Sequence, residues 1–158
     1  MLMQSPHYLG ASHGSQDHSQ EERCPRILLA EDDEAIRRLT ARMLKQGGCE
    51  VEECEDGAVA WEQIQRECYD LLLTDYQMPH LTGLELVEKV RSADMALPVI
   101  LASGTLPLDE LKAKSWLRIG ATLQKPYRTD ELLSLIEALL QTEGRAKEQL
   151  EECNHVVV

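Results

Sequence analysis

The sequence predicts an α/β fold in which a strand and a helix alternate five times around a parallel sheet. From Arg26 onward, short apolar runs alternate with longer amphipathic stretches, which is typical of such a fold. Three of the runs, at residues 27–30, 71–74 and 99–102, are almost continuously apolar. Continuous apolar runs are typical of strands that helices cover on both faces, so we expect these three in the centre of the sheet.

The first half of the chain predicts two strands, each followed by a helix, and then the third strand. After the strand at 27–30, a helix is indicated by apolar residues at i, i+3, i+7 and i+8, and it ends at Gly47 and Gly48, where a left-handed cap is easily formed. A weaker run at 50–53 fits a strand nearer the edge. A second helix follows Asp56 and Gly57, before the strand at 71–74. The apolar residues that mark these two helices are Ile36, Leu39, Met43 and Leu44, and then Ala60, Trp61 and Ile64.

The second half predicts three more helices and two strands. The third helix follows Thr82 and Gly83, ahead of the strand at 99–102. The fourth is less amphipathic and is expected to run to Arg118, and it precedes a strand at 121–124 that a turn closes off. The fifth has a broad apolar stripe between Thr129 and Gly144. The marker residues are Leu84, Val87 and Val90, then Leu108 and Leu111, and finally Leu132, Leu133, Ile136, Leu139 and Leu140.

At 158 residues, the chain has the length of one domain. Residues 1–25 are rich in Ser, Gln, His and Gly, and we expect a flexible tail there. The folded domain is expected at residues 26–142, and residues 143–158 as a frayed or disordered C-terminal extension.

Composition excludes several classes of protein. With 28 acidic and 16 basic side chains, the net charge is −12, and a general nucleic-acid binder would instead need a basic surface. No apolar run approaches the roughly 18 residues that cross a bilayer, so we expect no membrane association and a cytoplasmic location. The five cysteines are odd in number and lack CxxC spacing, which argues against disulfide frameworks and structural zinc.

Polar residues follow four of the predicted strands. Ligands of open parallel sheets bind at the carboxyl ends of the strands, so these residues are expected to meet at one edge. The first strand is followed by Glu31, Asp32 and Asp33, the third by Asp75, the fourth by Ser103 and Gly104, and the fifth by Lys125 and Pro126.

This set of residues predicts a site for a divalent ion and a phosphoryl group. Carboxylates that meet at one edge repel one another unless a cation is present, and oxygen ligands suit Mg²⁺. Lys125 adds a positive charge, and Ser103 can donate a hydrogen bond. Taken singly, each residue has an ordinary alternative: Asp32 or Asp33 can cap a helix, Asp75 can open a turn, and Lys125 can be solvated. Four strand ends with matching polarity favour the joint site.

At this point the sequence resembles a known family. The segments ILLAEDDE at 27–34 and DLLLTDYQMP at 70–79, with Gly83 and the Lys125-Pro126 pair, are similar to the receiver domain of two-component response regulators, in particular to stand-alone receivers of the chemotaxis type. The resemblance covers residues 26–142. It implies a doubly wound, flavodoxin-like sheet with strand order 2-1-3-4-5.

The resemblance also implies a role for each site residue. Asp75 corresponds to the carboxylate that accepts the phosphoryl group. Asp33, Asp75 and the backbone carbonyl of Gln77 correspond to direct Mg²⁺ ligands, and Asp32 to the acid that reaches the metal through water. Lys125 corresponds to the residue that pairs with the phosphoryl oxygens, Ser103 to the hydroxyl that senses them, and the peptide bond before Pro126 to one that is commonly cis.

Two positions depart from the family pattern. Three residues before Lys125, where the family often has an aromatic side chain that turns inward on activation, this chain has Thr122. After Pro126, where Phe is frequent, it has Tyr127, which we expect to fill the same packing position.

The resemblance therefore implies a phosphoprotein that signals and does not turn over a metabolite. We expect a histidine kinase or a phosphotransfer protein as phosphoryl donor, and a downstream protein partner at the face formed by the fourth helix, fifth strand and fifth helix. No output domain is expected after residue 142. A Mg²⁺-dependent phosphatase with an aspartyl nucleophile is one alternative, but such enzymes need a second Asp where Gln77 stands. A receiver that docks without phosphorylation is the other.

Overall fold

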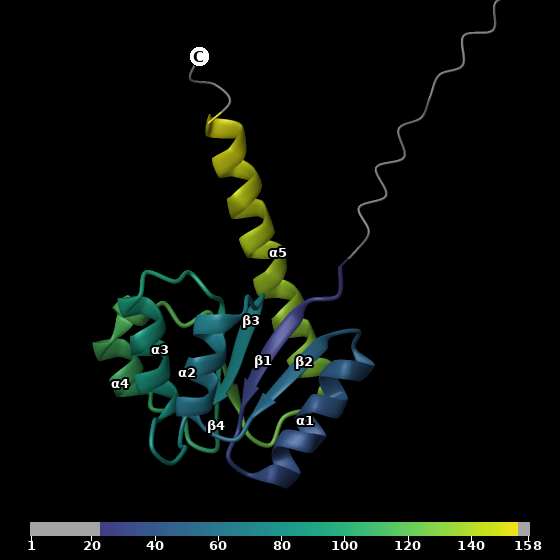
Figure 1. Ribbon diagram of the computed structural model, residues 1–158, viewed down its shortest axis with the longest axis vertical. Coiled ribbons are helices and arrows are strands. Elements are labelled where there is room, and N and C mark those ends of the chain that lie inside the picture. The colour runs from purple at the N-terminus through teal and green to yellow at the C-terminus, as the bar shows by residue number, and fades with distance from the viewer. Residues whose placement is uncertain (1–22, 155–158) are drawn as a thin grey trace, which may run out of the picture.

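A five-stranded parallel sheet forms the centre of the molecule. The computed structural model describes residues 23–154, with side chains through residue 144, so most of the expected tail and the last residues lie outside the described part. The strands are β1 (Arg26–Ala30), β2 (Glu50–Cys54), β3 (Leu71–Asp75), β4 (Val99–Ser103) and β5 (Ala121–Gln124). Their order is β2-β1-β3-β4-β5 (Figure 1). This confirms the predicted fold class, the strand order and the three central strands.

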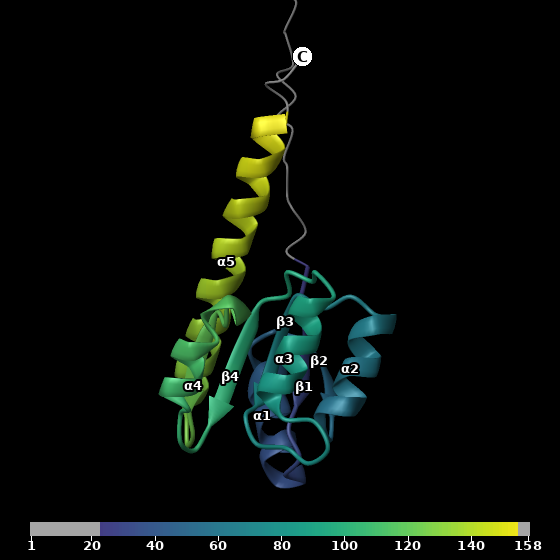
Figure 2. The same ribbon diagram turned by 90° about the vertical axis from the view of Figure 1, so that its left-hand side faces the viewer.

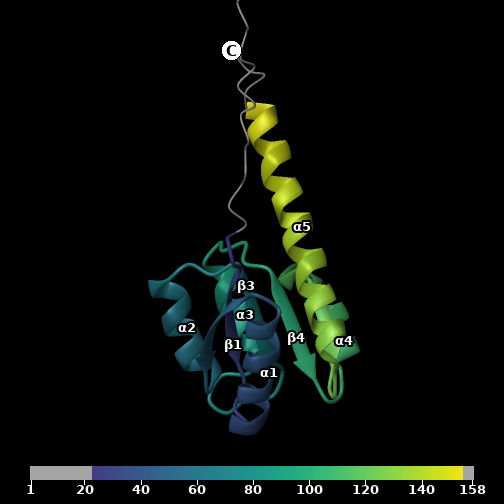
Figure 3. The same cartoon turned by 90° about the vertical axis from the view of Figure 1, so that its right-hand side faces the viewer.

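Helices cover both faces of this sheet (Figures 2 and 3). Helices α2 (Gly57–Arg66) and α3 (Gly83–Ser92) pack on one face, and α1 (Glu34–Gln46) and α5 (Thr129–Asn154) on the other. A short helix α4 (Leu108–Ala113) and a 3₁₀ turn η1 (Ser115–Leu117) connect β4 to β5. None of the helices within residues 23–154 combines the length and apolar character needed to span a bilayer.

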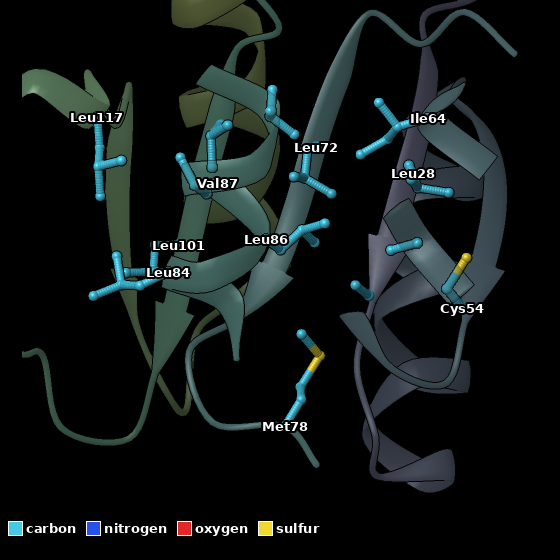
Figure 4. Close-up of a cluster of buried hydrophobic side chains, with 14 residues drawn as sticks. Leu28, Cys54, Ile64, Leu72, Met78, Leu84, Leu86, Val87, Leu101 and Leu117 are labelled. Carbon is cyan, nitrogen blue, oxygen red and sulfur yellow. The ribbon is translucent and has the colours of Figure 1, made fainter. Parts of the chain in front are cut away.

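Alternate residues of the central strands feed two separate cores. In β1, Leu28 packs with α2 and α3, whereas Leu29 packs with α1 and α5. Figure 4 shows the first of these cores, with Leu72 of β3 facing Val87 of α3 and Met78 closing its lower end. Burial on both faces explains why these strands are continuously apolar.

The helix boundaries follow from local capping groups. The side chain of Asp56 accepts a hydrogen bond from the Val59 amide at the start of α2. Thr82 and Glu85 form a capping box at the start of α3. After α1, Gly48 adopts a left-handed φ of 83°, as the paired glycines predict.

The apolar stripe predicted for α1 is only partly correct. The helix buries Thr40, Ala41 and Leu44. Leu39, one of the apolar residues that indicated this helix, is 53% exposed, and Ile36 is also exposed. Periodicity finds the helix but not its buried face, which carries Thr40 and Ala41 beside Leu44.

Helix α4 ends earlier than predicted, and α5 continues into the extension predicted after residue 142. Helix α4 stops at Ala113, with Lys114 outside the helical conformation, and is followed by the turn η1, which the left-handed Arg118, with φ of 46°, brings to an end. Helix α5 continues past Gly144 to Asn154 and projects beyond the sheet in Figure 1. A single exposed Gly costs a helix about 1 kcal/mol, which does not end it when helix-forming residues follow.

The chain joins the domain slightly before the first strand. Arg23 forms an ion pair with Asp70, at 2.8 Å, and the carbonyl of Pro25 accepts a hydrogen bond from the Glu50 amide. Residues 23–25, assigned to the tail from the sequence, thus contact the edge of the sheet opposite to the predicted site.

Candidate functional site

Three carboxylates meet at the carboxyl edge of the sheet. Glu31 and Asp32 follow β1, and Asp75 ends β3, the neighbouring strand. One carboxylate oxygen from each of the three lies within 4.8 Å of the others. Glu31 is buried, Asp75 is partly buried and Asp32 is exposed, so the cluster opens to solvent on the Asp32 side.

A lysine from the far side of the sheet completes this cluster. The Nζ of Lys125 lies 2.5 Å from Oε2 of Glu31 and 3.1 Å from Oδ1 of Asp75. The amide of Lys125 donates to the carbonyl of Ser103, which extends the pairing of β4 and β5 and fixes where the lysine starts. One positive charge therefore faces three negative charges.

Strand alternation explains why these side chains meet. Along a strand, side chains two residues apart point to the same face. The series that lead to the cluster run through the core under α1 and α5: Ile27, Leu29 and Glu31; Leu71, Leu73 and Asp75; Leu123 and Lys125. The cluster is the polar continuation of this core beyond the strand ends.

The placement of Asp33 differs from the role that the resemblance implied. Its side chain caps α1, accepting a hydrogen bond from the Ile36 amide at 2.9 Å, and it is not part of the carboxylate cluster. Glu31, to which sequence reasoning gave no role, is in the cluster instead. The helix needs an acceptor at its first turn, and Asp33 is the acid in register to supply it. The alternation of Ile27, Leu29 and Glu31 is the signal that could have identified Glu31.

Burial and charge act in opposite directions on the titration of the cluster. Burial raises the pKa of Glu31 and of Asp75, although the hydrogen bond and charge of Lys125 oppose this rise. Burial lowers the pKa of Lys125, but its contacts with Glu31 and Asp75 outweigh burial and leave it raised. The cluster thus favours the uptake of positive charge.

Ser103 lies at the same edge, at the end of β4. It is buried, and its hydroxyl donates to the carbonyl of Thr105 at 2.6 Å and accepts from the Thr105 amide at 3.2 Å. Its hydroxyl therefore interacts with its own loop. Gln77, whose carbonyl the resemblance implied as a ligand, lies in the loop after β3 with an exposed side chain.

The loop after Asp75 is held by a close backbone approach. The amide of Gly83 donates to the carbonyl of Tyr76 at 2.9 Å. A Cβ on Gly83 would lie 2.1 Å from the carbonyl oxygen of Asp75, so only glycine fits there. The start of α3 thereby fixes the end of β3.

The two positions that depart from the family pattern lie on either side of Lys125. Thr122 is half-buried in β5 and lines a hollow of about 370 Å³ beside α4 and η1. Tyr127 packs on the second core, and its hydroxyl lies 2.9 Å from that of Thr40. The peptide bond between Lys125 and Pro126 is cis, as expected.

The residues present fit a magnesium ion. Glu31, Asp32 and Asp75 supply closely spaced oxygen donors, which are the ligands that Mg²⁺ prefers. The raised pKa values of Glu31 and Asp75 show that added positive charge would be stabilising at this position. Asp75 also has the open side and neighbouring lysine that a nucleophilic carboxylate requires.

Comparison with known proteins finds one family. The model of the response regulator receiver domain matches residues 27–137. The response regulator receiver protein CpdR of Brucella abortus is 35% identical over 115 residues, which cover 73% of this chain and 96% of CpdR. The response regulator MprA of Mycobacterium leprae is 36% identical, over 73% of this chain and 51% of MprA. In the 3',5'-cyclic-nucleotide phosphodiesterase regA of Dictyostelium discoideum, 37% identity extends over 74% of this chain but only 15% of regA.

Solved structures show the same similarity. A Francisella response regulator receiver domain superposes with a TM-score of 0.70 and 26% identity, over 75% of this chain and 98% of that one. The response regulator TrrA of Thermotoga maritima, solved in complex with Mg²⁺ and BeF, superposes with a TM-score of 0.65 and 27% identity, over 73% of this chain and 98% of TrrA.

Proposed function

The chain belongs to the response regulator receiver family, and on this basis we propose that it accepts a phosphoryl group on Asp75 and signals through a phosphorylation-dependent protein contact. The observation that supports this most directly is the position of Asp75, at the end of a central strand, 3.1 Å from Lys125 and beside two further carboxylates. The donor would be a histidine kinase or a phosphotransfer protein, and the exchange would take place in the cytoplasm.

The proposed step is an in-line transfer between two protein side chains. A carboxylate oxygen of Asp75 forms a bond to the phosphorus of a phosphohistidine, and the bond from phosphorus to the imidazole nitrogen breaks. The electron pair of that bond stays on the imidazole, which then takes up a proton. Lys125 is positioned to pair with the phosphoryl oxygens, and hydrolysis of the acyl phosphate by water would return Asp75 to its starting state.

The metal requirement follows from the charges at the site. Glu31 and Asp32 would hold Mg²⁺ together with Asp75. The ion would offset the negative charge of the carboxylates and of the incoming phosphoryl oxygens. Lys125 alone cannot offset them, since it already contacts Glu31 and Asp75.

We place the output surface at α4, β5 and α5. Helix α4 buries none of its side chains, and Leu108 and Trp116 are 55% and 53% exposed. These exposed apolar groups on α4 and η1 suit a protein partner whose affinity changes when α4 moves.

The alternatives have less support. A phosphatase with an aspartyl nucleophile would need a general acid two residues later, and the carboxamide of Gln77 cannot donate a proton in that way. We therefore propose chemistry limited to transfer onto Asp75 and hydrolysis from it. A docking role without phosphorylation gives no reason for the contact between Lys125 and Asp75.

The experiment is phosphorylation by acetyl phosphate with and without Mg²⁺, followed by intact mass measurement. The wild-type protein should gain one phosphoryl group only when Mg²⁺ is present, and Asp75→Asn should gain none. Asp94→Asn is the matched control, because Asp94 is exposed, far along the chain, and has a φ of 55° that Asn tolerates well. Labelling of Asp75→Asn at the wild-type level would show that another residue is the acceptor.

A further inference from the structure

Helix α4 is held by several polar contacts and by Leu111, which is partly buried against the first core. It has no buried side chain, and the nearest fully buried anchor of this connection is Leu117 in η1. Its first turn has no side-chain cap, since Pro107 occupies that position. Few apolar contacts make an element easy to displace, so the polar contacts decide where α4 lies.

One of these contacts starts next to the proposed phosphoacceptor. The hydroxyl of Tyr76 donates to Oε2 of Glu110, in the middle of α4, at 2.7 Å. The backbone of Tyr76 is fixed on both sides, because its amide donates to the carbonyl of Ala102 at 2.8 Å and its carbonyl accepts from Gly83 at 2.9 Å. The ring thus bridges the end of β3 and α4.

The acceptor of this bond is held from the other side as well. Lys114 at the end of α4 contacts Glu110 at 3.2 Å and Glu88 of α3 at 2.6 Å. The hydrogen bond from Tyr76 lowers the pKa of Glu110, and so does the contact with Lys114. Glu110 is therefore an ionised acceptor, and hydrogen bonds to charged groups are stronger than neutral ones.

Strand β5 has no aromatic side chain at position 122 that could contact α4. Thr122 stands where an aromatic side chain would otherwise connect β5 to α4, and a hollow of about 370 Å³ lies beside it. Within the described loop that follows β3, the side chain of Tyr76 reaches α4 and contacts Glu110.

We propose that the hydrogen bond from Tyr76 to Glu110 holds α4 in the position it has in the unphosphorylated chain, and that it links the state of Asp75 to α4. This inference rests on the proposed function. It assigns to Tyr76 a positioning role in signalling and no part in the phosphoryl transfer.

A second tie at the start of the same connection explains how phosphorylation would act on this link. The hydroxyl of Ser103 is bonded to Thr105, two residues before the turn that leads into α4. A phosphoryl group on Asp75 would compete with the Thr105 carbonyl for that hydroxyl. Release of the loop would let α4 move away from the end of β3 and break its bond to Tyr76, so a chain that already lacks this bond has less of the change left to make.

The test measures hydrogen exchange of residues 105–118 in wild type, Tyr76→Phe and Tyr69→Phe. The matched control is Tyr69→Phe, because the Tyr69 hydroxyl is buried at the other end of β3 and makes no hydrogen bond among the described residues. Without phosphate, Tyr76→Phe should speed exchange of residues 105–118 about three- to tenfold, the range expected for loss of one hydrogen bond that is only partly buried. Tyr69→Phe should leave that exchange at the wild-type level.

Addition of Mg²⁺ and beryllofluoride as a phosphoryl mimic gives the second arm. The mimic should speed exchange of residues 105–118 in wild type, and the change should be at least halved in Tyr76→Phe, where the bond is already absent. Uptake of a phosphoryl group from acetyl phosphate should be equal in the two proteins. Glu110→Ala removes both the hydrogen bond to Tyr76 and the ion pair to Lys114, whereas Lys114→Ala removes only the ion pairs. Exchange of residues 105–118 should therefore be faster in Glu110→Ala than in Lys114→Ala, and the difference should match the effect of Tyr76→Phe.

The outcomes separate the two proposals. If Tyr76→Phe exchanges like wild type both with and without the mimic, the link through Tyr76 is wrong even though Asp75 is phosphorylated. If wild type neither accepts a phosphoryl group nor responds to the mimic, the proposed function is wrong. In that case, hydrogen exchange of wild type and Tyr76→Phe without the mimic still decides whether Tyr76 holds α4.

Discussion

At the residue scale, neighbouring acids at the end of β1 have different tasks. Glu31 and Asp32 lie in the carboxylate cluster, whereas Asp33 caps α1. The resemblance implied a direct metal contact for Asp33 and a contact through water for Asp32. In the structure, the two acids after β1 that lie near Asp75 are Glu31 and Asp32, one residue earlier than the pair Asp32 and Asp33 that the resemblance implied.

Adjacent substitutions can separate these assignments. Asp32→Asn should weaken Mg²⁺ binding about tenfold or more, because it removes a charged oxygen from the cluster. Asp33→Asn should change Mg²⁺ affinity less than about twofold and leave stability close to wild type, because Asn is as good a helix cap as Asp. Calorimetric titration with MgCl₂ and thermal unfolding measure the two properties. A larger loss of affinity in Asp33→Asn would instead support the ligand set implied by the resemblance.

These residues show what the sequence could predict about the site. Asp75 and Ser103 were found because each directly follows an apolar run whose end is unambiguous, and Lys125 because it stands between the last, weaker strand and Pro126. Three acids in a row after β1 give no such boundary, and their roles depend on where the strand stops and the helix begins. That boundary is decided by the cap of α1, which apolar periodicity does not report.

At the element scale, the segment from α4 to β5 depends on a single arginine of α3. Nε of Arg91 donates to the carbonyl of Leu117 at 2.7 Å, and Nη2 donates to that of Arg118 at 3.2 Å. Nη1 donates to the carbonyls of Met95 and Leu97, at 2.8 and 2.9 Å. Burial lowers the pKa of Arg91, and a planar group with several donors is needed to satisfy carbonyls in two separate loops.

Arg91→Lys should therefore destabilise the fold although it keeps the charge. A lysine has one nitrogen and cannot reach carbonyls on both loops, so a loss of about 2–4 kcal/mol in the free energy of unfolding is expected. Arg38→Lys on α1 is the control, since Arg38 is exposed and pairs only with Glu34 among the described residues, and it should change stability by less than about 0.5 kcal/mol. Urea unfolding measures both, and equal stability of the two variants would contradict the bridging role.

The helices also show why the presence of an element is easier to predict from sequence than its end and its buried face. All five helices were found from their apolar spacing and caps. The end of the turn η1 after α4 coincides with the left-handed conformation of Arg118, whose carbonyl accepts from Arg91 of α3. The exposure of Leu39 depends on which face of α1 packs on the sheet, and that face carries Thr40, Ala41 and Leu44. Both are tertiary effects that no local pattern contains.

At the scale of the whole molecule, the strands that stabilise the fold also assemble a cluster that opposes it. The apolar series of β1 and β3 end in Glu31 and Asp75, so the packing that forms the core under α1 and α5 also brings like charges together. Burial is the main reason why the pKa values of Glu31 and Asp75 are raised; the charges of neighbouring carboxylates add to the rise, and Lys125 opposes only part of it. The fold thus holds its functional site at a cost in stability.

This cost predicts how stability depends on pH. A carboxyl group whose pKa is raised by folding binds its proton more tightly in the folded protein, so the free energy of unfolding falls as the pH rises from about 4 through the folded-state pKa. Asp75→Asn removes one such group. Without divalent ions, this variant should be more stable than wild type at pH 7, unfolding about 2–5 °C higher.

The same link between protonation and folding determines how the stability difference between Asp75→Asn and wild type varies with pH. It should shrink as the pH is lowered toward 4, because wild-type Asp75 then becomes protonated and no longer keeps a buried negative charge beside the other carboxylates. Added Mg²⁺ should raise the stability of wild type more than that of Asp75→Asn, since the ion relieves the same repulsion and binds the folded state. Thermal and urea unfolding between pH 4 and 7.5, with Asp94→Asn as the control for loss of an exposed carboxylate, measure both effects. A difference that is constant with pH, or that grows toward pH 4, would mean that the acidic edge is not the source of the cost.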